Sequence, residues 1–263
     1  MATIGYSLSK VKSQARKIVI YLPGRISKAV LCRVKAMGWE LHPVDHIPPP
    51  NNGAGIWPAF ADRYTKLRVW TLDQVGIKSA VYIDADTLVV KNFDELFELP
   101  FVFAAVPDVW LDGRGFSVGF NAGVMAFKPN SEVFKDMLSK VEDAKFDREE
   151  AEQSYLNLYY GSQVVRLPHI YNGNLAIKAR SRGYWAAMQE QMRIIRYTLA
   201  KPFNDRPWCG DKACEGGDVF DISRQQDVLE AAKTSWGGAF REEVERAIAE
   251  RDEMMLALGN SCA

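Results

Sequence analysis

The sequence has no long hydrophobic run and no excess of charge of either sign. None of its apolar stretches approaches the roughly 20 residues that cross a bilayer, so no membrane span is expected. Its 33 lysines and arginines balance 33 aspartates and glutamates, which argues against nucleic acid as a partner and against a polybasic membrane anchor. The first residues lack the basic head and apolar middle of a signal peptide, and this predicts a cytoplasmic protein.

Several common functional motifs are also missing. The sequence has four cysteines, and the one close pair, Cys209 and Cys214, does not have the usual spacing of a zinc site. The three histidines, His42, His46 and His169, show no metal-ligand spacing either. There is no P-loop, no nucleophile elbow and no GxGxxG motif after a strand. Zinc chemistry, P-loop nucleotide hydrolysis and serine-hydrolase chemistry are therefore not indicated.

What the sequence does have is a large apolar content in alternating strand and helix patterns. Apolar residues make up 48% of the chain and aromatic residues 11%, enough for a large core. Short apolar runs predict strands, and helical periodicity predicts helices. The strands fall at 17–22, 39–47, 79–84, 101–106, 122–127, 163–167 and 192–197, and the helices at 27–37, 62–75, 131–141, 148–159, 222–233 and 240–258. This order predicts an α/β fold with a mixed, mostly parallel sheet flanked by helices.

The most informative stretch is an apolar strand that runs directly into two aspartates, Asp84 and Asp86. Side chains at i and i+2 of an extended chain point the same way, so both carboxylates can face one ligand. They follow the carboxyl end of a strand, where open α/β sheets bind ligands. Two carboxylates suit Mg²⁺ or Mn²⁺ that bridges to a diphosphate. The alternative is that both are ordinary turn residues at a strand end.

A series of motifs surrounds this pair. They read RYTKLRVWTLDQ at 63–74, YIDADTL at 82–88, NFDELF at 92–97, AVPD at 105–108 and FNAGV at 120–124. In order and spacing this series resembles the glycogenin-like glycosyltransferases of family 8. The resemblance implies a GT-A fold, with a Rossmann-like nucleotide-sugar domain over residues 1–205. The loop-like composition and helical periodicity that follow predict a loop plus helical C-terminal extension over 206–263. It also implies transfer of a hexose from a UDP-sugar to a hydroxyl acceptor, metal-assisted through the DxD motif, with retention of anomeric configuration.

The same resemblance implies roles for individual residues. Asp84 and Asp86 would be the metal ligands, with Mn²⁺ or Mg²⁺ as cofactor, and the candidates near the anomeric carbon are Asp108, Glu152 and Gln153. The donor-binding candidates are Lys66, Asp84, Asp86, Asn121, Ala122, Gly123, Arg196 and Lys201. Lys66 is also a cation on the helix before the DxD strand, well placed to offset phosphate charge.

One position departs from the family pattern in a way that bears on the metal. The family places a histidine, its third metal ligand, five or six residues before the lysine that corresponds to Lys201, and this chain has Arg196 there. Arginine has only hydrogen-bond donors and stays protonated, so it cannot ligate a cation. The guanidinium could instead pair with the diphosphate and partly replace the charge of the metal. Metal dependence is therefore left open.

The start of the chain departs as well. Residues 4–11 already resemble the helix that follows the family's first strand, so the N-terminus looks shortened and uridine recognition is in doubt. Residues 3–8 also alternate between polar and apolar, so a short strand is the alternative to a helix there. The resemblance places a tyrosine that the enzyme glucosylates on itself in the acceptor region, 172–185. This chain has no tyrosine there before Tyr184, so self-glucosylation at the equivalent site is not expected. The acceptor is then a separate small molecule or glycan.

Two further questions stay open from the sequence. The last predicted helix, 240–258, has an apolar face that either packs on its own domain or joins two copies into a homodimer. The main prediction for function is a retaining glycosyltransferase. The alternatives are a catalytically impaired family member that binds a glycan or a protein partner, and a hydrolase that uses a carboxylate pair without nucleotide.

Overall fold

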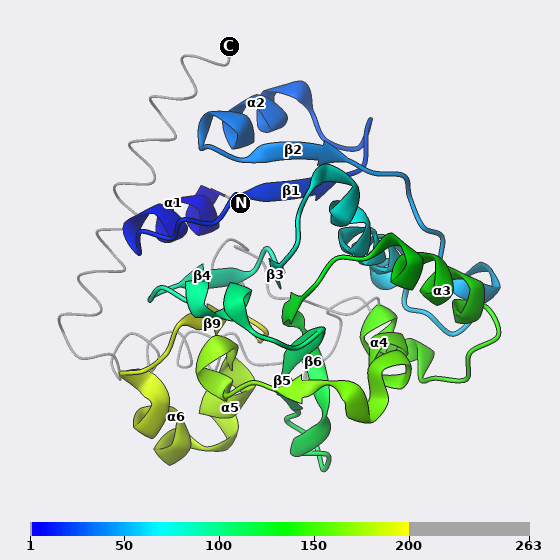
Figure 1. The fold of residues 1–263 in the computed structure, drawn as a ribbon. Coiled ribbons are helices and arrows are strands. Elements are labelled where there is room, and N and C mark those ends of the chain that lie inside the picture. The colour runs from blue at the N-terminus through cyan, green and yellow to red at the C-terminus, as the bar shows by residue number, and fades with distance from the viewer. Residues whose placement is uncertain (1, 200–263) are drawn as a thin grey trace, which may run out of the picture.

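The computed structural model describes residues 2–199, and Figure 1 shows how their elements are arranged. At the top of that view lies a βαβ unit, in which β1 (Ile18–Tyr21) runs parallel to β2 (Glu40–Pro43). The two strands are joined by α2 (Lys28–Ala36). The Ser27 hydroxyl caps this helix by accepting from the Val30 N–H at 3.4 Å.

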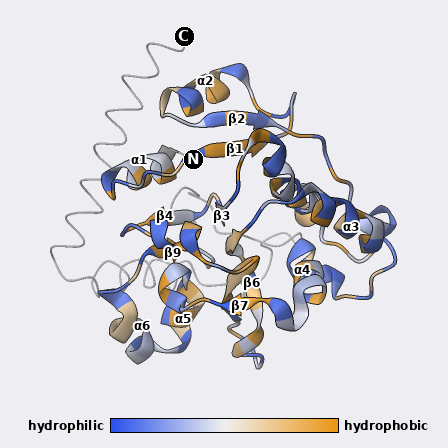
Figure 2. Ribbon diagram, in the orientation of Figure 1, coloured by the Kyte–Doolittle hydropathy of each residue, from blue (hydrophilic) through white to orange (hydrophobic). Residues whose placement is uncertain are grey.

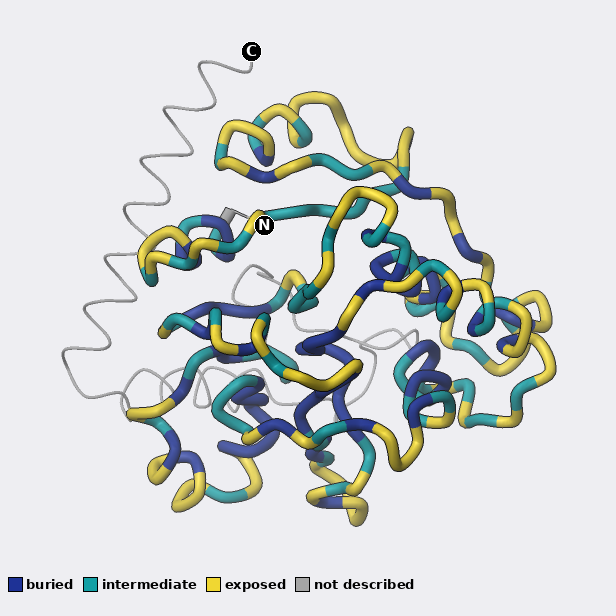
Figure 3. Tube along the Cα trace, viewed as in Figure 1, coloured by how far each residue is buried: buried dark blue, intermediate teal, exposed yellow. Residues whose placement is uncertain are grey.

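A four-stranded sheet in the order β3-β6-β5-β7 forms the centre of the fold. Its strands are β3 (Ala80–Ile83), β5 (Phe103–Val109), β6 (Phe116–Phe127) and β7 (Val165–Arg166). The long strand β6 runs antiparallel to both of its neighbours, while β5 and β7 are parallel. Much of β5 and β6 is apolar in Figure 2 and buried in Figure 3, since helices and loops cover both faces of this sheet.

A second sheet of three short strands lies beside the end of β3, in the order β4-β9-β8. Its strands are β4 (Thr87–Val89), β8 (Gly173–Asn174) and β9 (Ile194–Arg196). Strands β4 and β9 are antiparallel, and their register places Arg196 opposite Thr87. This pairing brings a residue from the end of the described chain next to the segment that follows β3.

Helices and helical turns make up most of the remainder. The segments with 3₁₀-type turns are η1 (Pro50–Gly53), η2 (Pro58–Val75), η3 (Asp94–Glu98), η4 (Arg148–Glu150), η5 (Gly161–Gln163) and η6 (His169–Tyr171). The further α-helices are α1 (Ala2–Lys10), α3 (Ser131–Val141), α4 (Glu152–Tyr160), α5 (Leu175–Arg180) and α6 (Arg182–Gln189). Among residues 2–199, no helix is both long enough and apolar enough to cross a membrane.

The alternation of side chains along the strands divides the core into two main layers. On β5, Phe103 and Ala105 face a layer built with η2, α3 and α4, while Ala104 and Val106 face a layer built with α1 and β4. Trp70 of η2 anchors the first layer, with its ring centroid 4.7 Å from that of Phe127 and 6.1 Å from those of Phe103 and Tyr160. Both faces of the sheet are therefore covered, which fixes the strand ends that carry the site.

Asp94 ties the segment after α1 to the start of η3. Its carboxylate accepts hydrogen bonds from the Ser13 hydroxyl at 2.6 Å, from the Gln14 N–H at 2.9 Å and from the Asn92 amide at 3.2 Å. Burial by itself would raise the pKa of Asp94, but these three hydrogen bonds outweigh it and lower that pKa.

The α/β class and the predicted strands are confirmed, although most of these strands are shorter than predicted. The helix predicted at 62–75 is a 3₁₀-type segment, and the one predicted at 148–159 is interrupted at Ala151. Residues 2–10 form helix α1, so the alternative of a strand over 3–8 is wrong. Parallel pairing is less dominant than predicted, because β6 is antiparallel to both neighbours and β4 to β9. The predicted extension over 206–263, with its helices at 222–233 and 240–258, lies outside the described residues, as does Lys201.

Candidate functional site

The two aspartates of the DxD motif lie in the turn between β3 and β4. The backbone N–H of Asp84 donates to the Gly123 carbonyl at 2.8 Å, which continues the β3–β6 pairing by one residue. The Thr87 hydroxyl donates to the Asp84 carbonyl at 2.8 Å. Tyr82, two residues earlier on β3, donates its hydroxyl to Asp84 Oδ1 at 2.7 Å. The turn is thus fixed on both sides at the carboxyl end of β3.

Two largely buried cations face these carboxylates. Lys66 Nζ, from η2, lies 3.4 Å from Asp84 Oδ1. Arg196 Nη2, from β9, lies 2.7 Å from Asp84 Oδ2, and Arg196 Nε lies 3.5 Å from Asp86 Oδ1. Burial by itself would raise the pKa of Asp84, but Lys66 and Arg196 outweigh burial and hold that pKa well below its usual range. Asp84 is therefore ionised at neutral pH.

Lys66 connects the DxD turn to the start of α4. Its Nζ lies 2.6 Å from Glu152 Oε1 and donates to the Ala122 carbonyl at 3.3 Å. Glu152 is 2% exposed, and among the described residues its Oε2 has no hydrogen-bond partner. The preceding residue, Ala151, has φ 51° and ψ −129°, a backbone conformation that favours glycine. Glu152 is thus held inside the protein at a strained turn, with one oxygen paired to a lysine.

Asp108 is a third buried carboxylate, and it is held by neutral groups. The side-chain amides of Asn121 and Gln153 donate to its two oxygens at 3.0 and 2.8 Å, and the Val109 N–H donates at 2.8 Å. Burial raises the pKa of Asp108, and the hydrogen bonds only partly oppose that rise. Gln153 also accepts from the Ala122 N–H at 3.0 Å, which joins α4 to β6.

Asn121 lies at the centre of these contacts. Its Oδ1 accepts from the Gly123 N–H at 3.0 Å, from the Asn172 amide at 3.1 Å and from Arg196 Nη1. Gly123 matters here because it has no side chain: a Cβ at this position would lie only 2.5 Å from the guanidinium carbon of Arg196. The guanidinium therefore fills the space that any other residue at position 123 would occupy.

The fold brings together all the predicted site residues that the structure describes, from η2, the turn after β3, β5, β6, α4 and β9, and we call this group of residues the DxD cluster. Lys201 lies outside the described residues. The sequence analysis missed Tyr82 as a partner of Asp84, although strand alternation predicts that side chains 82 and 84 share a face.

The arrangement does not fit a resident divalent metal. Mg²⁺ prefers near-octahedral oxygen ligands at about 2.0–2.1 Å, and such an ion would have to approach Asp84 and Asp86 where Arg196 already lies. Arginine stays protonated, so an ion in that place would lie against a positive charge. In the part of the chain that the structure describes, no three His, Cys, Asp or Glu side chains gather as a possible metal site.

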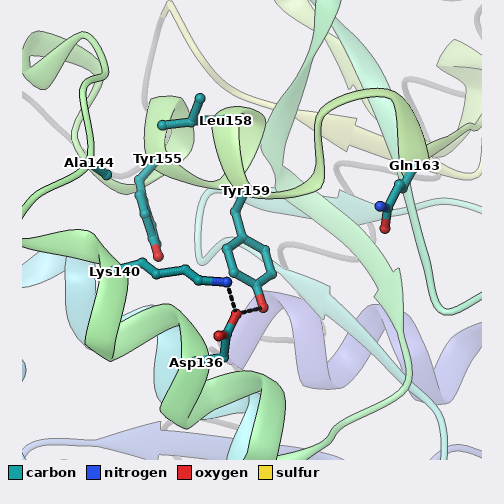
Figure 4. Close-up of a pocket in the computed structure, with 7 residues that line it drawn as sticks. All are labelled: Asp136, Lys140, Ala144, Tyr155, Leu158, Tyr159 and Gln163. Atoms are coloured by element: carbon teal, nitrogen blue, oxygen red, sulfur yellow. Dashed lines mark hydrogen bonds and ion pairs between the residues drawn. The ribbon is translucent and has the colours of Figure 1, made fainter.

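A separate surface pocket of about 410 Å³ lies between α3 and α4 (Figure 4). Lys140 Nζ and the Tyr159 hydroxyl both lie 2.7 Å from Asp136 Oδ2, and Figure 4 shows all three side chains at the pocket. None of the residues lining it belongs to the DxD cluster. These three side chains bond to one another, and we assign the pocket no role.

Comparison with known proteins places the cluster in a family context. The family model "Glycosyl transferase family 8" matches residues 60–207, more than half of the chain. Glycogenin from Neurospora crassa is 26% identical over 223 residues, which cover 83% of this chain and 31% of that protein. Galactinol synthase 5 from Arabidopsis thaliana is 27% identical over 245 residues, which cover 82% of this chain and 71% of that protein.

Two solved structures show the same fold at low sequence identity. Galactosyltransferase LgtC, in complex with donor and acceptor sugar analogues, has a TM-score of 0.55 and 17% identity over 88% of this chain and 90% of its own. The apo form of glycosyltransferase GlyE from Streptococcus pneumoniae has a TM-score of 0.54 and 20% identity, covering 78% of this chain and 53% of its own. The described residues therefore have a GT-A fold.

Proposed function

The chain belongs to glycosyl transferase family 8, and we propose that it transfers a hexose from a UDP-sugar to a hydroxyl acceptor with retention of anomeric configuration. The observation that carries this proposal is the gathering of Lys66 and Arg196 beside the carboxylates at the end of β3. Strand ends of this kind bind ligands in open α/β sheets. Two buried cations there suit an anionic donor.

In the proposed reaction the bond between the anomeric carbon and the phosphate oxygen breaks, and its electron pair leaves with the diphosphate. A new bond forms between the anomeric carbon and the acceptor oxygen on the same face. The hydroxyl proton passes to the departing phosphate oxygen. Lys66 and Arg196 stabilise the negative charge that develops on that oxygen, an effect that is strong in a site shielded from water.

Asp108 is the better of the two candidate carboxylates for the anomeric carbon. Glu152 is neutralised by Lys66 at 2.6 Å, whereas Asp108 forms no ion pair within 4 Å among the described residues. Amide groups hold both oxygens of Asp108 in a fixed orientation. Such a carboxylate can stabilise positive charge on the sugar ring as the diphosphate departs.

The Mn²⁺ or Mg²⁺ that the resemblance implies is not part of this proposal, because Arg196 faces the two carboxylates that would bind it. The same observation favours a second candidate function. A family member whose DxD carboxylates are satisfied by its own cations could bind a glycan or a protein partner without catalysis.

Two measurements distinguish catalytic transfer from non-catalytic binding. The first is calorimetric titration with UDP, and the second is an assay of UDP release from a panel of UDP-sugars and hydroxyl acceptors. We expect the wild type to bind UDP, and we expect Asp108→Asn to lower the rate of transfer while UDP binding is kept. Asp136→Asn is the matched control, since that carboxylate lies in the pocket outside the cluster. A folded sample that binds no UDP in either Mn²⁺ or EDTA would support the non-catalytic alternative.

A further inference from the structure

We propose that Arg196 is the built-in cation of the donor site, so that this chain binds the diphosphate of its nucleotide sugar without a divalent metal. The proposal rests on the function proposed above. It states that the positive charge beside the diphosphate belongs to a side chain and not to a metal ion.

The position of Arg196 is fixed by the backbone. Arg196 ends β9, and the β4–β9 register places it opposite Thr87, directly after the DxD turn. The next residue, Tyr197, donates its backbone N–H to the Asp86 carbonyl at 2.9 Å. The DxD turn and residue 196 are therefore held together by main-chain hydrogen bonds on both sides.

The guanidinium is enclosed by groups that fit it. Nη2 contacts Asp84, Nη1 contacts the amide oxygen of Asn121, and Nε lies nearest to Asp86. The bare Gly123 backbone leaves room for the guanidinium carbon, and the whole side chain is 12% exposed. Its place is thus part of the packing of the fold rather than one of many surface positions.

Arg196 keeps N–H groups that can bind a ligand. A guanidinium has five N–H groups, and only one bond each from Nη1 and Nη2 goes to a described acceptor. With respect to the described residues, one N–H on each terminal nitrogen is left, and two such N–H groups can bind two phosphate oxygens. Lys66 Nζ, on the other side of Asp84, adds a second cation to the same place.

Arg196 and a divalent ion would compete for the same two carboxylates. A divalent ion bound to Asp84 and Asp86 would lie within a few ångströms of a permanent positive charge in a largely buried site, where like charges repel strongly. Loss of Arg196 would remove this repulsion. A histidine at position 196 would also add a neutral nitrogen beside two carboxylates, and together these make a set of three ligands for Mn²⁺.

The test measures UDP binding by calorimetry in EDTA and in Mn²⁺, and Mn²⁺ binding alone by electron paramagnetic resonance. We expect the UDP affinity of the wild type to differ by less than about threefold between the two buffers, since the charge is supplied by the protein. Arg196→Ala should lose on the order of 10–100-fold in EDTA, the usual effect of losing a charged hydrogen-bond pair. Arg196→His should lose UDP binding in EDTA, regain it in Mn²⁺, and bind Mn²⁺ where the wild type does not.

Arg193→Ala is the matched control, because that arginine contacts Asn92 and Glu95 and lies outside the cluster. Circular dichroism establishes that each variant is folded, and the comparison of buffers on the wild type needs no variant at all. Wild-type binding only in Mn²⁺ would overturn the inference and leave the proposed function standing. Binding in neither buffer would overturn both.

Discussion

Gly123 offers a test of the site geometry that does not depend on any ligand. A methyl group at this position would lie 2.5 Å from Arg196 Cζ and Nη1, which real contacts do not tolerate. The guanidinium cannot easily move aside, because Asp84 and Asn121 hold it from other directions. Gly123→Ala should therefore push Arg196 away from Asp84.

The size of the effect follows from the pair that is disturbed. Removing one partner of a buried ion pair costs about 3–5 kcal/mol. Lys66 still faces Asp84 after Arg196 moves, so we expect Gly123→Ala to cost about 2–3 kcal/mol of unfolding free energy. In an Arg196→Ala background the three atoms nearest to that methyl group, all from the Arg196 side chain, are gone. There the change should be neutral or stabilise by up to about 1 kcal/mol, as expected when alanine replaces a strand glycine.

The double-mutant cycle compares the wild type, Gly123→Ala, Arg196→Ala and the double variant. Urea denaturation of these four proteins, followed by circular dichroism, gives the coupling energy between positions 123 and 196. Gly113→Ala is the control, because nothing lies within 4 Å of a Cβ at that glycine. Equal costs of Gly123→Ala in the two backgrounds would refute the reasoning, since the clash would then not involve Arg196. A stabilising effect in the wild type would refute it as well.

Three further predictions concern stability and can be checked by urea denaturation. Asp94→Asn should cost about 1–2 kcal/mol at pH 7, because charged hydrogen bonds are lost. Since folding lowers the pKa of Asp94, its stabilisation is present above its ordinary pKa of about 3.9 and is lost as the pH falls further, so wild type and variant should converge in acid; a constant difference would contradict this. Lys66→Met should cost about 3–5 kcal/mol by leaving Glu152 buried without its cation, and adding Glu152→Gln should recover part of the loss; no recovery would show that the pair is not the cause. Trp70→Ala should cost about 3–5 kcal/mol by opening a cavity in the core layer, and a cost below about 1 kcal/mol would show that this layer is loosely packed.

The sequence predicted those parts of the fold that carry their own pattern. The βαβ unit at the start and the strand before Asp84 have clear apolar periodicity and turn residues, and both are found. Strands β4 and β8, of three and two residues, were not predicted. They exist because β9 pairs with both, and such a long-range partner cannot be read from local pattern.

The site was predicted in two different ways. The apolar strand before Asp84 was enough to predict carboxylates at the carboxyl end of a strand. Strand alternation does not explain how Asp86 comes to face Arg196, because residues 85 and 86 lie in a turn. Residues as distant as Lys66 and Glu152 could be brought together only through the family resemblance, because nothing local links positions 86 residues apart. The sequence raised a contact between Arg196 and a diphosphate, but not its place between the carboxylates, which follows from the register of β9 and the bare face of Gly123.

The pairing of Thr87 with Arg196 has a consequence for how such proteins can change over generations. Whatever side chain stands at position 196 faces the DxD turn, because the backbone and not the side chain sets that position. Some arginine codons differ from histidine codons by a single base. Under the inference above, one point mutation therefore exchanges a cation that is part of the protein for a ligand of a metal ion that must be taken up.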